Sequence, residues 1–451
     1  MPSYTINPDK FYRFPSDLSI VPYKGKYLVI APRAARWIVL ENHNQINVLE
    51  FLKKGYSIKE TLENPDLNKE DIRIVITQVE ARRLCDNASR SITEDKRSLH
   101  IYLTNQCNLS CPHCYMFSGK QNNNELSTDE IIGLITDYAK VAAGNRITIS
   151  GGEPTIHNDF DKIVKTTSEL GLEINLLTNG SLLSASRIHT LSKFISSIQI
   201  SIDGFSEESD AVIRGVGHFE KALLVVDRFV NQGIETSVAI TPTLEMLREH
   251  HDEYAEFARS LAMKYLGKSF KVKFAEGLSA GRNVNPTKES NKEYETIVNG
   301  INKKLYGNDF DLIPFVETMR NDVILDNCMF GVFAVASNGD VYFCPEIGSL
   351  PKIANIRTSS FQDIFEQSLA AEKAVSISNL SPCNQCDIRY ICGGGCRIEE
   401  FPVLTKRKTF SNVDLGSISK RKCSAAIKEK FFDLMIRSNE YLFVPLFADK
   451  Q

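Results

Sequence analysis

Apolar residues recur along the central part of the chain in two alternating patterns. Short runs rich in β-branched residues predict six strands, at residues 100–103, 147–150, 174–177, 198–202, 236–240 and 270–274. Between them, apolar positions at helical spacing predict five helices, at residues 128–142, 160–170, 184–193, 219–231 and roughly 245–263. This alternation predicts an α/β fold with a parallel sheet, either open or curled into a partial (β/α)6 barrel.

The first 93 residues follow a different pattern and predict a separate unit. We expect a hairpin, two short helices and a longer helix with one apolar face, at residues 18–31, 46–53, from 57 and from 68. Ser57 and Glu60 form a capping-box pattern, and Asn68 can cap the longer helix. A small sheet with three helices predicts a winged-helix-like domain, joined to the rest by a polar linker over residues 82–96.

Candidate chemistry gathers where the predicted central strands end. The first four strands are followed, in order, by residues 107–114, 151–154, 178–180 and 203–204. Loops at the carboxyl edge of a parallel sheet lie close together and commonly build the site of an α/β protein. These four segments therefore predict one shared site.

Composition narrows the possible functions. The chain has 451 residues, 42% of them hydrophobic, and a net charge of −3, so it is large enough for two or three domains and has no basic signature for nucleic acid. No apolar stretch is long enough to span a bilayer, and the first residues lack a signal-peptide pattern. We therefore expect a cytoplasmic protein that binds neither nucleic acid nor membrane. Eleven cysteines in such a protein indicate metal or redox chemistry, because cytoplasmic thiols are kept reduced.

The cysteines fall into two groups, and the first has a tight spacing. Cys107, Cys111 and Cys114 form a C-x3-C-x2-C pattern. Three thiolates can hold a [4Fe–4S] cluster and leave one iron open for a small molecule. A zinc site with His113 as fourth ligand is the alternative, although a histidine between two ligands is poorly placed to join them.

These residues resemble those of the radical S-adenosylmethionine enzymes, in which the three cysteines hold the catalytic cluster. The resemblance implies that the open iron binds S-adenosylmethionine and that one electron cleaves this cofactor to a 5′-deoxyadenosyl radical. It also implies cofactor contacts by a Gly-Gly-Glu-Pro segment, by a strand end near the ribose and by an arginine near the carboxylate. The matching residues here are Gly151, Gly152, Glu153 and Pro154, then Ser201 and Asp203, then Arg214. The alternatives are a tight turn, a turn carboxylate and a surface arginine.

The second group of cysteines resembles the SPASM domain, which carries two auxiliary clusters in enzymes that modify peptides or proteins. The resemblance assigns four of the seven to a distal cluster and three to a proximal one: Cys383, Cys386, Cys392 and Cys423, and Cys328, Cys344 and Cys396. Relatives usually add a proximal ligand shortly before the first of the seven, where this chain has Asp322, Asp326 and Asn327. The proximal cluster is therefore expected either to have an open iron or to take an oxygen ligand. Zinc knuckles are the alternative.

The N-terminal unit resembles the leader-peptide recognition domain (PqqD-like) of peptide-maturation systems, which binds a leader as an added strand at a sheet edge. A winged helix that binds nucleic acid is the alternative. The expected domains are the leader-binding domain at 1–93, the radical barrel at 98–310, the SPASM domain at 311–430 and a tail at 431–451.

Together the resemblances imply a peptide maturase with S-adenosylmethionine and three [4Fe–4S] clusters. It would abstract hydrogen from a ribosomally made precursor peptide and install a crosslink, with a thioether favoured, using reduced flavodoxin or ferredoxin. One rival is a sulfatase maturase that forms formylglycine, but its aspartate base is replaced here by Pro345 and then Glu346. The other rival is a non-enzymatic iron–sulfur or zinc-binding adaptor.

Overall fold

A nine-stranded sheet forms the centre of the molecule. The computed structural model describes residues 7–86, 90–91, 98–141, 145–320, 323–328, 330–401, 419 and 423–439. Six strands pair in parallel in chain order: β5 (Ser98–Tyr102), β6 (Arg146–Ser150), β7 (Glu173–Thr178), β8 (Ser197–Ser201), β9 (Glu235–Ile240) and β10 (Phe270–Phe274). The predicted parallel α/β sheet is therefore confirmed.

The sheet is longer than the six predicted strands. β12 (Phe333–Val335) pairs in parallel with β5, and β13 (Asp340–Tyr342) and β14 (Ala354–Asn355) continue it antiparallel. These strands have two or three residues each, so they carry too few positions for a periodic signal in the sequence. The cysteine-rich part of the chain is thus joined to the barrel by backbone hydrogen bonds.

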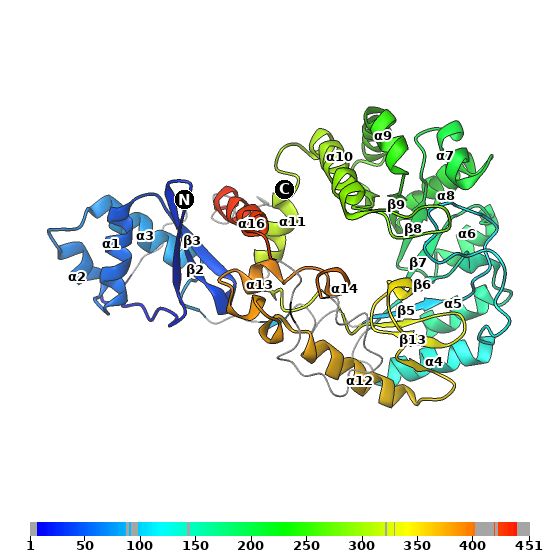
Figure 1. The fold of residues 1–451 in the computed structure, drawn as a ribbon, viewed down its shortest axis with the longest axis horizontal. Coiled ribbons are helices and arrows are strands. Elements are labelled where there is room, and N and C mark those ends of the chain that lie inside the picture. The colour runs from blue at the N-terminus through cyan, green and yellow to red at the C-terminus, as the bar shows by residue number, and fades with distance from the viewer. Residues whose placement is uncertain are drawn as a thin grey trace.

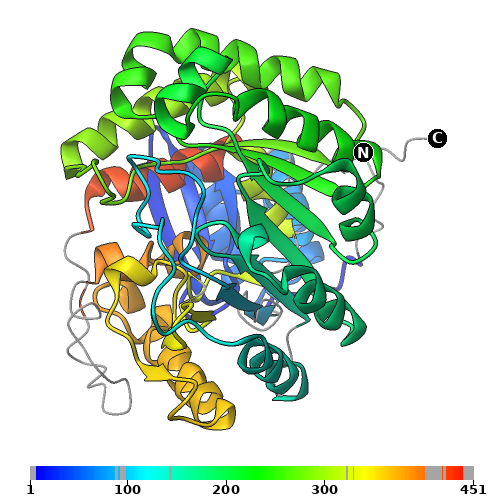
Figure 2. The same ribbon diagram turned by 90° about the vertical axis from the view of Figure 1, so that its right-hand side faces the viewer.

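The helices between the strands cover the outer face of the curved sheet (Figure 2). The expected ones are α4 (Thr128–Val141), α5 (Phe160–Glu169), α6 (Ala185–Leu191), α8 (Phe219–Asn231) and α9 (Leu244–Lys264). Two more were not predicted, α7 (Glu207–Arg214) and α10 (Lys288–Tyr306). Apolar side chains from both layers form one continuous core, which includes Ile149, Leu176, Ile200 and Phe229. No helix among the described residues is long and apolar enough to cross a bilayer.

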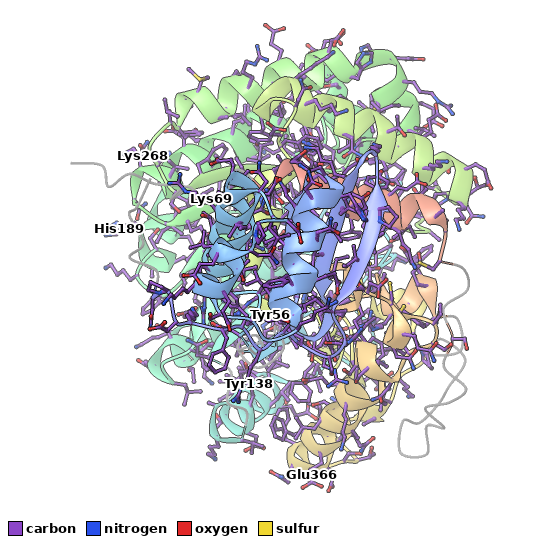
Figure 3. The ribbon with its side chains drawn as sticks, turned by 90° about the vertical axis from the view of Figure 1, so that its left-hand side faces the viewer. Tyr56, Lys69, Tyr138, His189, Lys268 and Glu366 are labelled. Carbon is purple, nitrogen blue, oxygen red and sulfur yellow. The ribbon has the colours of Figure 1, made fainter. Side chains whose placement is uncertain are left out.

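The N-terminal unit has its own sheet and core. Its elements are β1 (Ser19–Tyr23), β2 (Lys26–Ala31), β3 (Arg36–Leu40), α1 (His43–Lys53), α2 (Ile58–Glu63) and α3 (Lys69–Ala81). Ser57 and Glu60 form the predicted capping box, and the Asn68 side chain accepts hydrogen bonds at the start of α3. β3 was not predicted: all five of its residues are buried, so it lacks the alternation of a half-exposed strand. Figure 3 views this unit from outside, with Tyr56 and Lys69 labelled on it.

The N-terminal sheet is buried on both faces. One face packs on α1 to α3, and the other packs against the C-terminal part of the chain. The second contact contains Leu28, Ile30, Trp37, Val39, Val316, Ile388, Ile391 and Met435. Trp37 Nε1 also donates a hydrogen bond of 3.1 Å to the carbonyl oxygen of Met435, in α16 (Ala425–Arg437). The unit is therefore docked beside α16 and α13 (Arg389–Cys392), as Figure 1 shows.

Two expected boundaries differ from the structure. Within the expected linker, β4 (Arg90–Ser91) pairs in parallel with β11 (Val323–Ile324), because the chain returns beside this segment after α11 (Leu312–Arg320). Residues 87–89 and 92–97 of the linker lie outside the described residues. The expected tail begins at residue 431, but α16 crosses that point, since its apolar side chains Phe431, Phe432 and Met435 pack on the N-terminal sheet.

Candidate active site

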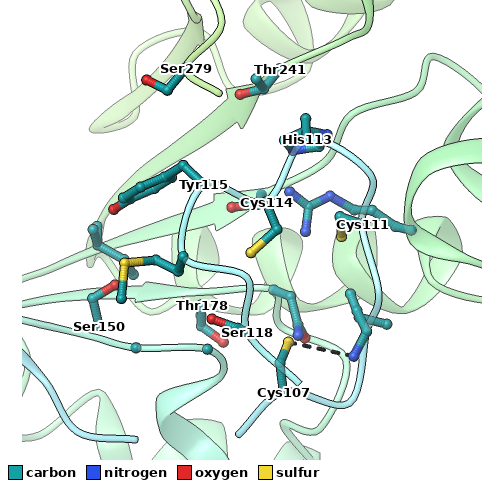
Figure 4. Close-up of a pocket in the computed structure, with 18 of the residues that line it drawn as sticks. Cys107, Cys111, His113, Cys114, Tyr115, Ser118, Ser150, Thr178, Thr241 and Ser279 are labelled. Atoms are coloured by element: carbon teal, nitrogen blue, oxygen red, sulfur yellow. Dashed lines mark hydrogen bonds between the residues drawn. The ribbon is translucent and has the colours of Figure 1, made fainter. Parts of the chain in front are cut away.

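A cavity of about 360 Å³ opens at the carboxyl ends of the parallel strands (Figure 4). The loop after β5 contributes one wall, and the ends of β6, β7 and β8 contribute the other. The lining includes Cys107, Cys111, Cys114, Gly151, Gly152, Thr178, Asn179, Ser201, Arg214, Thr241 and Ser279. Residues from three of the four expected segments therefore meet at this cavity, whereas residues 203–204 are not among its lining residues.

The three cysteines of the first motif all line this cavity. Cys107 is held at the start of the loop, where its N–H donates to the Gly119 carbonyl at 3.0 Å and its Sγ accepts from Leu109 N at 3.4 Å. Burial raises the pKa of Cys111 to about 11, so its free thiol is neutral at pH 7. Coordination to a metal is the interaction that converts such a thiol to a thiolate.

The arrangement fits a cluster better than a single ion. Among the described residues, no three His, Cys, Asp or Glu side chains meet closely enough to hold one metal ion. A cubane cluster binds its thiolates on different irons, so it needs thiols that surround a space. His113 lines the cavity, its Nε2 lies 3.4 Å from Asp203 Oδ2, and its Nδ1 is buried without a hydrogen-bond partner among the described residues.

Gly151 and Gly152 run directly against the strand and loop that carry the cysteines. Gly152 N donates to the Thr104 carbonyl and Glu153 N to the Gln106 carbonyl, each at 2.8 Å. A Cβ on Gly151, whose φ is +149°, would lie 2.6 Å from the Thr104 carbonyl oxygen, and one on Gly152 would overlap the Gln106 carbonyl. Only glycine permits this approach, so the pair does more than form a turn.

Glu153 lies behind the cavity wall and organises it. Its carboxylate is fully buried and accepts hydrogen bonds from Thr155 N at 3.1 Å, Thr178 Oγ1 at 2.7 Å and Asn179 N at 2.8 Å. Thr178 and Asn179 line the cavity, whereas Glu153 and Pro154 do not. The side chain of Glu153 therefore fixes the β7 loop, and the glycines before it face the cavity.

Ser201 and Arg214 line the cavity, but Asp203 does not. The Asp203 carboxylate is fully buried, accepts from Thr241 N at 2.8 Å and lies 2.7 Å from Arg214 Nε. Burial lowers the pKa of Arg214, but Asp203 and Cys111 raise it, and the net shift is upward. Arg214 is thus a fixed cation at the cavity wall, suited to a carboxylate. The expected ribose contact of Asp203 stays a prediction.

Arg282 is a site residue that sequence reasoning missed. Its Nη1 donates to the Cys111 carbonyl at 2.8 Å and its backbone N to the Cys114 carbonyl at 3.3 Å, while Nη2 donates to the Ser118 carbonyl. Asn283 N adds a bond of 2.7 Å to the Pro112 carbonyl. The segment after β10 thereby holds the cysteine loop from outside. Its place at the end of the sixth strand was the signal that could have drawn attention to it.

The structure also gathers part of the second cysteine group. Burial raises the pKa of Cys344 to about 12, and the nearby thiols of Cys328 and Cys396 contribute. These three are the expected proximal ligands. Cys383 is buried, and Cys386 N donates to its carbonyl at 2.9 Å. Cys423 is exposed immediately before α16, and Asp322 lies outside the described residues.

A pair of tyrosines connects the two cysteine regions. The hydroxyl groups of Tyr102 and Tyr115 lie 3.2 Å apart, and Tyr102 donates to the Pro345 carbonyl at 2.6 Å. Tyr115 follows Cys114 directly, and Pro345 follows Cys344. The first site and the expected proximal site are therefore neighbours across this contact.

Comparison with known proteins agrees with this geometry. Residues 101–258 match the radical SAM superfamily, and residues 327–387 match SPASM, an iron–sulfur cluster-binding domain. The chain is 28% identical over 311 residues to the mycofactocin maturase MftC of Mycolicibacterium smegmatis, covering 66% of this chain and 77% of that protein. It is 28% identical over 314 residues to the PqqA peptide cyclase of Rhizobium meliloti, covering 66% and 81%.

A third relative is named for the synthesis of heme and not for the modification of a peptide. An AdoMet-dependent heme synthase of Methanosarcina barkeri is 27% identical over 340 residues, covering 69% of this chain and 94% of that protein. Among solved structures, anSMEcpe with bound AdoMet has a TM-score of 0.56 at 18% identity, covering 77% of this chain and 99% of that one. This last likeness supports the fold alone.

The fold, the cysteine loop and these matches define a radical S-adenosylmethionine enzyme. The chain carries a radical SAM domain and a SPASM iron–sulfur domain. When bound, the cluster and S-adenosylmethionine supply a carbon radical by reductive cleavage of the cofactor. The non-enzymatic adaptor is thereby set aside. The residues of this chain hold the cluster loop, shape the glycine-lined wall and provide the fixed Arg214 cation.

Proposed function

We propose that this enzyme modifies a ribosomally made precursor peptide, abstracting a hydrogen and installing a crosslink, with a thioether favoured. The observation that carries the proposal is the N-terminal domain, which precedes both matched regions and packs beside the auxiliary cysteines. The names of the PqqA peptide cyclase and the mycofactocin maturase add support. Because one relative is named a heme synthase, similarity over the barrel does not by itself indicate a peptide substrate.

The N-terminal sheet has two edges at which a leader could pair. At the edge of β3, the Gln78 side chain accepts from Val39 N at 2.9 Å and donates to the Val39 carbonyl at 2.7 Å. These are the two bonds that an added strand would make. The β1 edge carries Pro22, which has no N–H to donate. The leader is therefore assigned to β3, where it would displace Gln78.

Substitution of Gln78 tests this assignment. Gln78→Leu frees both Val39 groups, so leader affinity should rise about three- to tenfold, as expected for two competing hydrogen bonds of modest net strength. The measurement is calorimetric titration of the full chain with a synthetic leader peptide. Gln45→Leu is the matched control, because Gln45 is an equally buried glutamine that bonds Glu41 and Asp71 instead. Unchanged affinity in Gln78→Leu would remove the leader from this edge.

Deleting residues 1–93 is a poor test of the same idea. Trp37 and Leu28 pack on Met435 and Ile388, so the deletion would expose a large apolar surface on the remaining chain. A point variant leaves that contact in place. Lower turnover of a full-length precursor by the truncated enzyme could therefore come from lost leader binding or from misfolding, and the measurement would not separate the two.

The thioether preference rests on the proximal cysteines. Cys328, Cys344 and Cys396 supply three thiolates, and a fourth cysteine is lacking in the stretch before them. An open iron could bind a substrate cysteine and fix its sulfur beside the carbon radical. With four distal and three catalytic ligands, the proposed total is three [4Fe–4S] clusters, or about 12 irons. Reduced flavodoxin or ferredoxin is the proposed electron donor.

Formylglycine formation on a protein is the second candidate. Burial and then Glu399 raise the pKa of Glu346, whereas Ser279, which lines the cavity, lowers it. A carboxyl group thus lies at the cavity edge two residues after Cys344. Reaction products separate the candidates: a crosslink changes a peptide's connectivity, whereas formylglycine adds an aldehyde that reacts with hydrazides.

A further inference from the structure

Arg397 is a fully buried cation in the cysteine-rich region. Its guanidinium donates only to main-chain carbonyls: Nε to Val375 at 2.9 Å, Nη1 to Gly393 at 2.9 Å and to Gly395 at 2.7 Å, and Nη2 to Asp326 at 3.2 Å. One side chain therefore joins three segments that are distant in the sequence. No ion pair to a carboxylate accompanies these bonds within the described part of the chain.

A buried cation without a countercharge is strongly unfavourable. The groups around Arg397 that can supply negative charge are the Asp326 carboxylate and cysteine thiolates. Gly394 lies between the guanidinium and one of these thiols. A Cβ placed on it would lie 3.2 Å from Arg397 Nη1 and 3.7 Å from Cys383 Sγ. Cys328 and Cys396 also act on the guanidinium electrostatically. Arg397 forms no ion pair with the Asp326 carboxylate in the described part of the chain, and metal-bound thiolates at these positions would add the compensating charge.

The glycines beside Arg397 place it between the two cysteine sets. Gly393, Gly394 and Gly395 have φ values of +68°, +81° and +80°, a run that other residues rarely adopt. This turn directs the carbonyls of its first and last glycine onto the guanidinium. It also connects Cys392, a proposed distal ligand, to Cys396, a proposed proximal ligand.

We propose that Arg397 is a positioning residue whose fixed charge lies between the two auxiliary clusters and raises the reduction potential of both. Each added electron makes a thiolate-bound cluster more negative, so a nearby buried cation stabilises the reduced state. The four hydrogen bonds keep the cation at one place. The inference rests on the proposed assignment of the seven cysteines to two clusters.

Potentiometry of the auxiliary clusters tests this role. The background is the full chain with Cys107→Ala, Cys111→Ala and Cys114→Ala, so that only auxiliary clusters contribute to the spectra. Arg397→Met removes the charge, and Arg397→Lys keeps it. Arg389→Met is the matched control, since Arg389 also bonds a ligand carbonyl, that of Cys386 at 3.0 Å, but is paired with Asp17 at 3.0 Å.

The expected result is a shift of the auxiliary midpoint potentials to more negative values in Arg397→Met, with Arg397→Lys close to the background and Arg389→Met shifted less. A Met variant with full iron and unchanged potentials would overturn the proposal. If Arg397→Met loses iron, Arg397→Lys decides between the two roles. Normal potentials in Arg397→Lys support the role of the charge. Iron loss in Arg397→Lys equal to that in Arg397→Met would mean that Arg397 has only a structural role. The triple-cysteine background protein should contain about eight irons, and about four would refute the assignment of two auxiliary clusters without refuting the role of Arg397. The potential shift is then measured on the one cluster that is present.

Discussion

The two cysteine regions are held in different ways. In the barrel, Cys107, Cys111 and Cys114 lie on a loop fixed by backbone hydrogen bonds to Gly119, and by Arg282. In the SPASM region, Cys328, Cys396 and Cys423 are exposed, and apart from α12 (Phe361–Ala374) the described segments between them form strands and helices of two to four residues. The comparison indicates that the fold builds the first site before metal binds, whereas metal completes the second.

Removing the catalytic thiols should have the largest effect. The Cys107→Ala, Cys111→Ala and Cys114→Ala triple variant should lose about four irons and all cleavage of S-adenosylmethionine, because these are the three proposed ligands of the catalytic cluster. Iron analysis and chromatography of 5′-deoxyadenosine measure both. Because the two cysteine regions are held independently, the irons of the auxiliary clusters should remain bound in this variant. Residual 5′-deoxyadenosine in this variant would mean that the catalytic cluster lies elsewhere.

Arg282 tests how the first site is held. Arg282→Ala removes the hydrogen bonds from its guanidinium to the Cys111 and Ser118 carbonyls, so cofactor cleavage should fall about 10- to 100-fold, as is typical for residues that orient metal ligands. Arg248→Ala is the control, since Arg248 forms a half-exposed ion pair with Glu293 at 2.7 Å, away from the loop. Equal rates in both variants would show that the loop does not need Arg282.

Arg282 also shows where prediction from sequence ended. The β/α alternation and the cysteine spacings are local patterns, so the sheet and both cysteine groups were predictable. Arg282 and Arg397 act through main-chain carbonyls of segments far away in the sequence, and nothing in the local pattern marks such contacts. β3 and β12 were missed for a related reason, because a fully buried or three-residue strand has no periodic signature.

Removal of iron should affect the second region more than the first. After anaerobic chelation, a protease should cut between residues 380 and 425 about tenfold faster, because five of the proposed cluster ligands lie in this stretch. The barrel core, which includes Ile149 and Phe229, does not depend on metal. Mass spectrometry of the fragments locates the cuts. Cleavage that appears first between residues 128 and 264 would mean that the barrel depends on metal more than the SPASM region does.

A surface contact between the two regions should have the smallest effect. Arg357, which follows β14, pairs with Glu130 of α4, and this hydrogen bonding lowers the pKa of Glu130 to about 2. Because the folded pKa is depressed, the contribution to stability is present above the usual glutamate pKa and is lost as the pH falls toward 2. Both side chains are partly exposed, so solvent screens the pair.

The corresponding variant is Arg357→Gln. It should lower the melting temperature by about 1 °C at pH 7 and leave it unchanged near pH 2, when measured by scanning calorimetry. Arg146→Gln, which breaks the exposed pair with Glu173 within the barrel, is the control for general charge loss. A large effect of Arg357→Gln at both pH values would mean that this contact does more than join two surfaces.

The central claim is that this radical enzyme crosslinks a precursor peptide, and mass spectrometry of that peptide tests it most directly. The reconstituted full chain is incubated without oxygen with S-adenosylmethionine, reductant and a candidate precursor peptide taken from a short reading frame next to its gene. The account predicts loss of two hydrogens per crosslink, with about one 5′-deoxyadenosine per event and fragmentation blocked between the joined residues. Abundant 5′-deoxyadenosine with an unchanged peptide mass, or a peptide aldehyde in place of a crosslink, would contradict it.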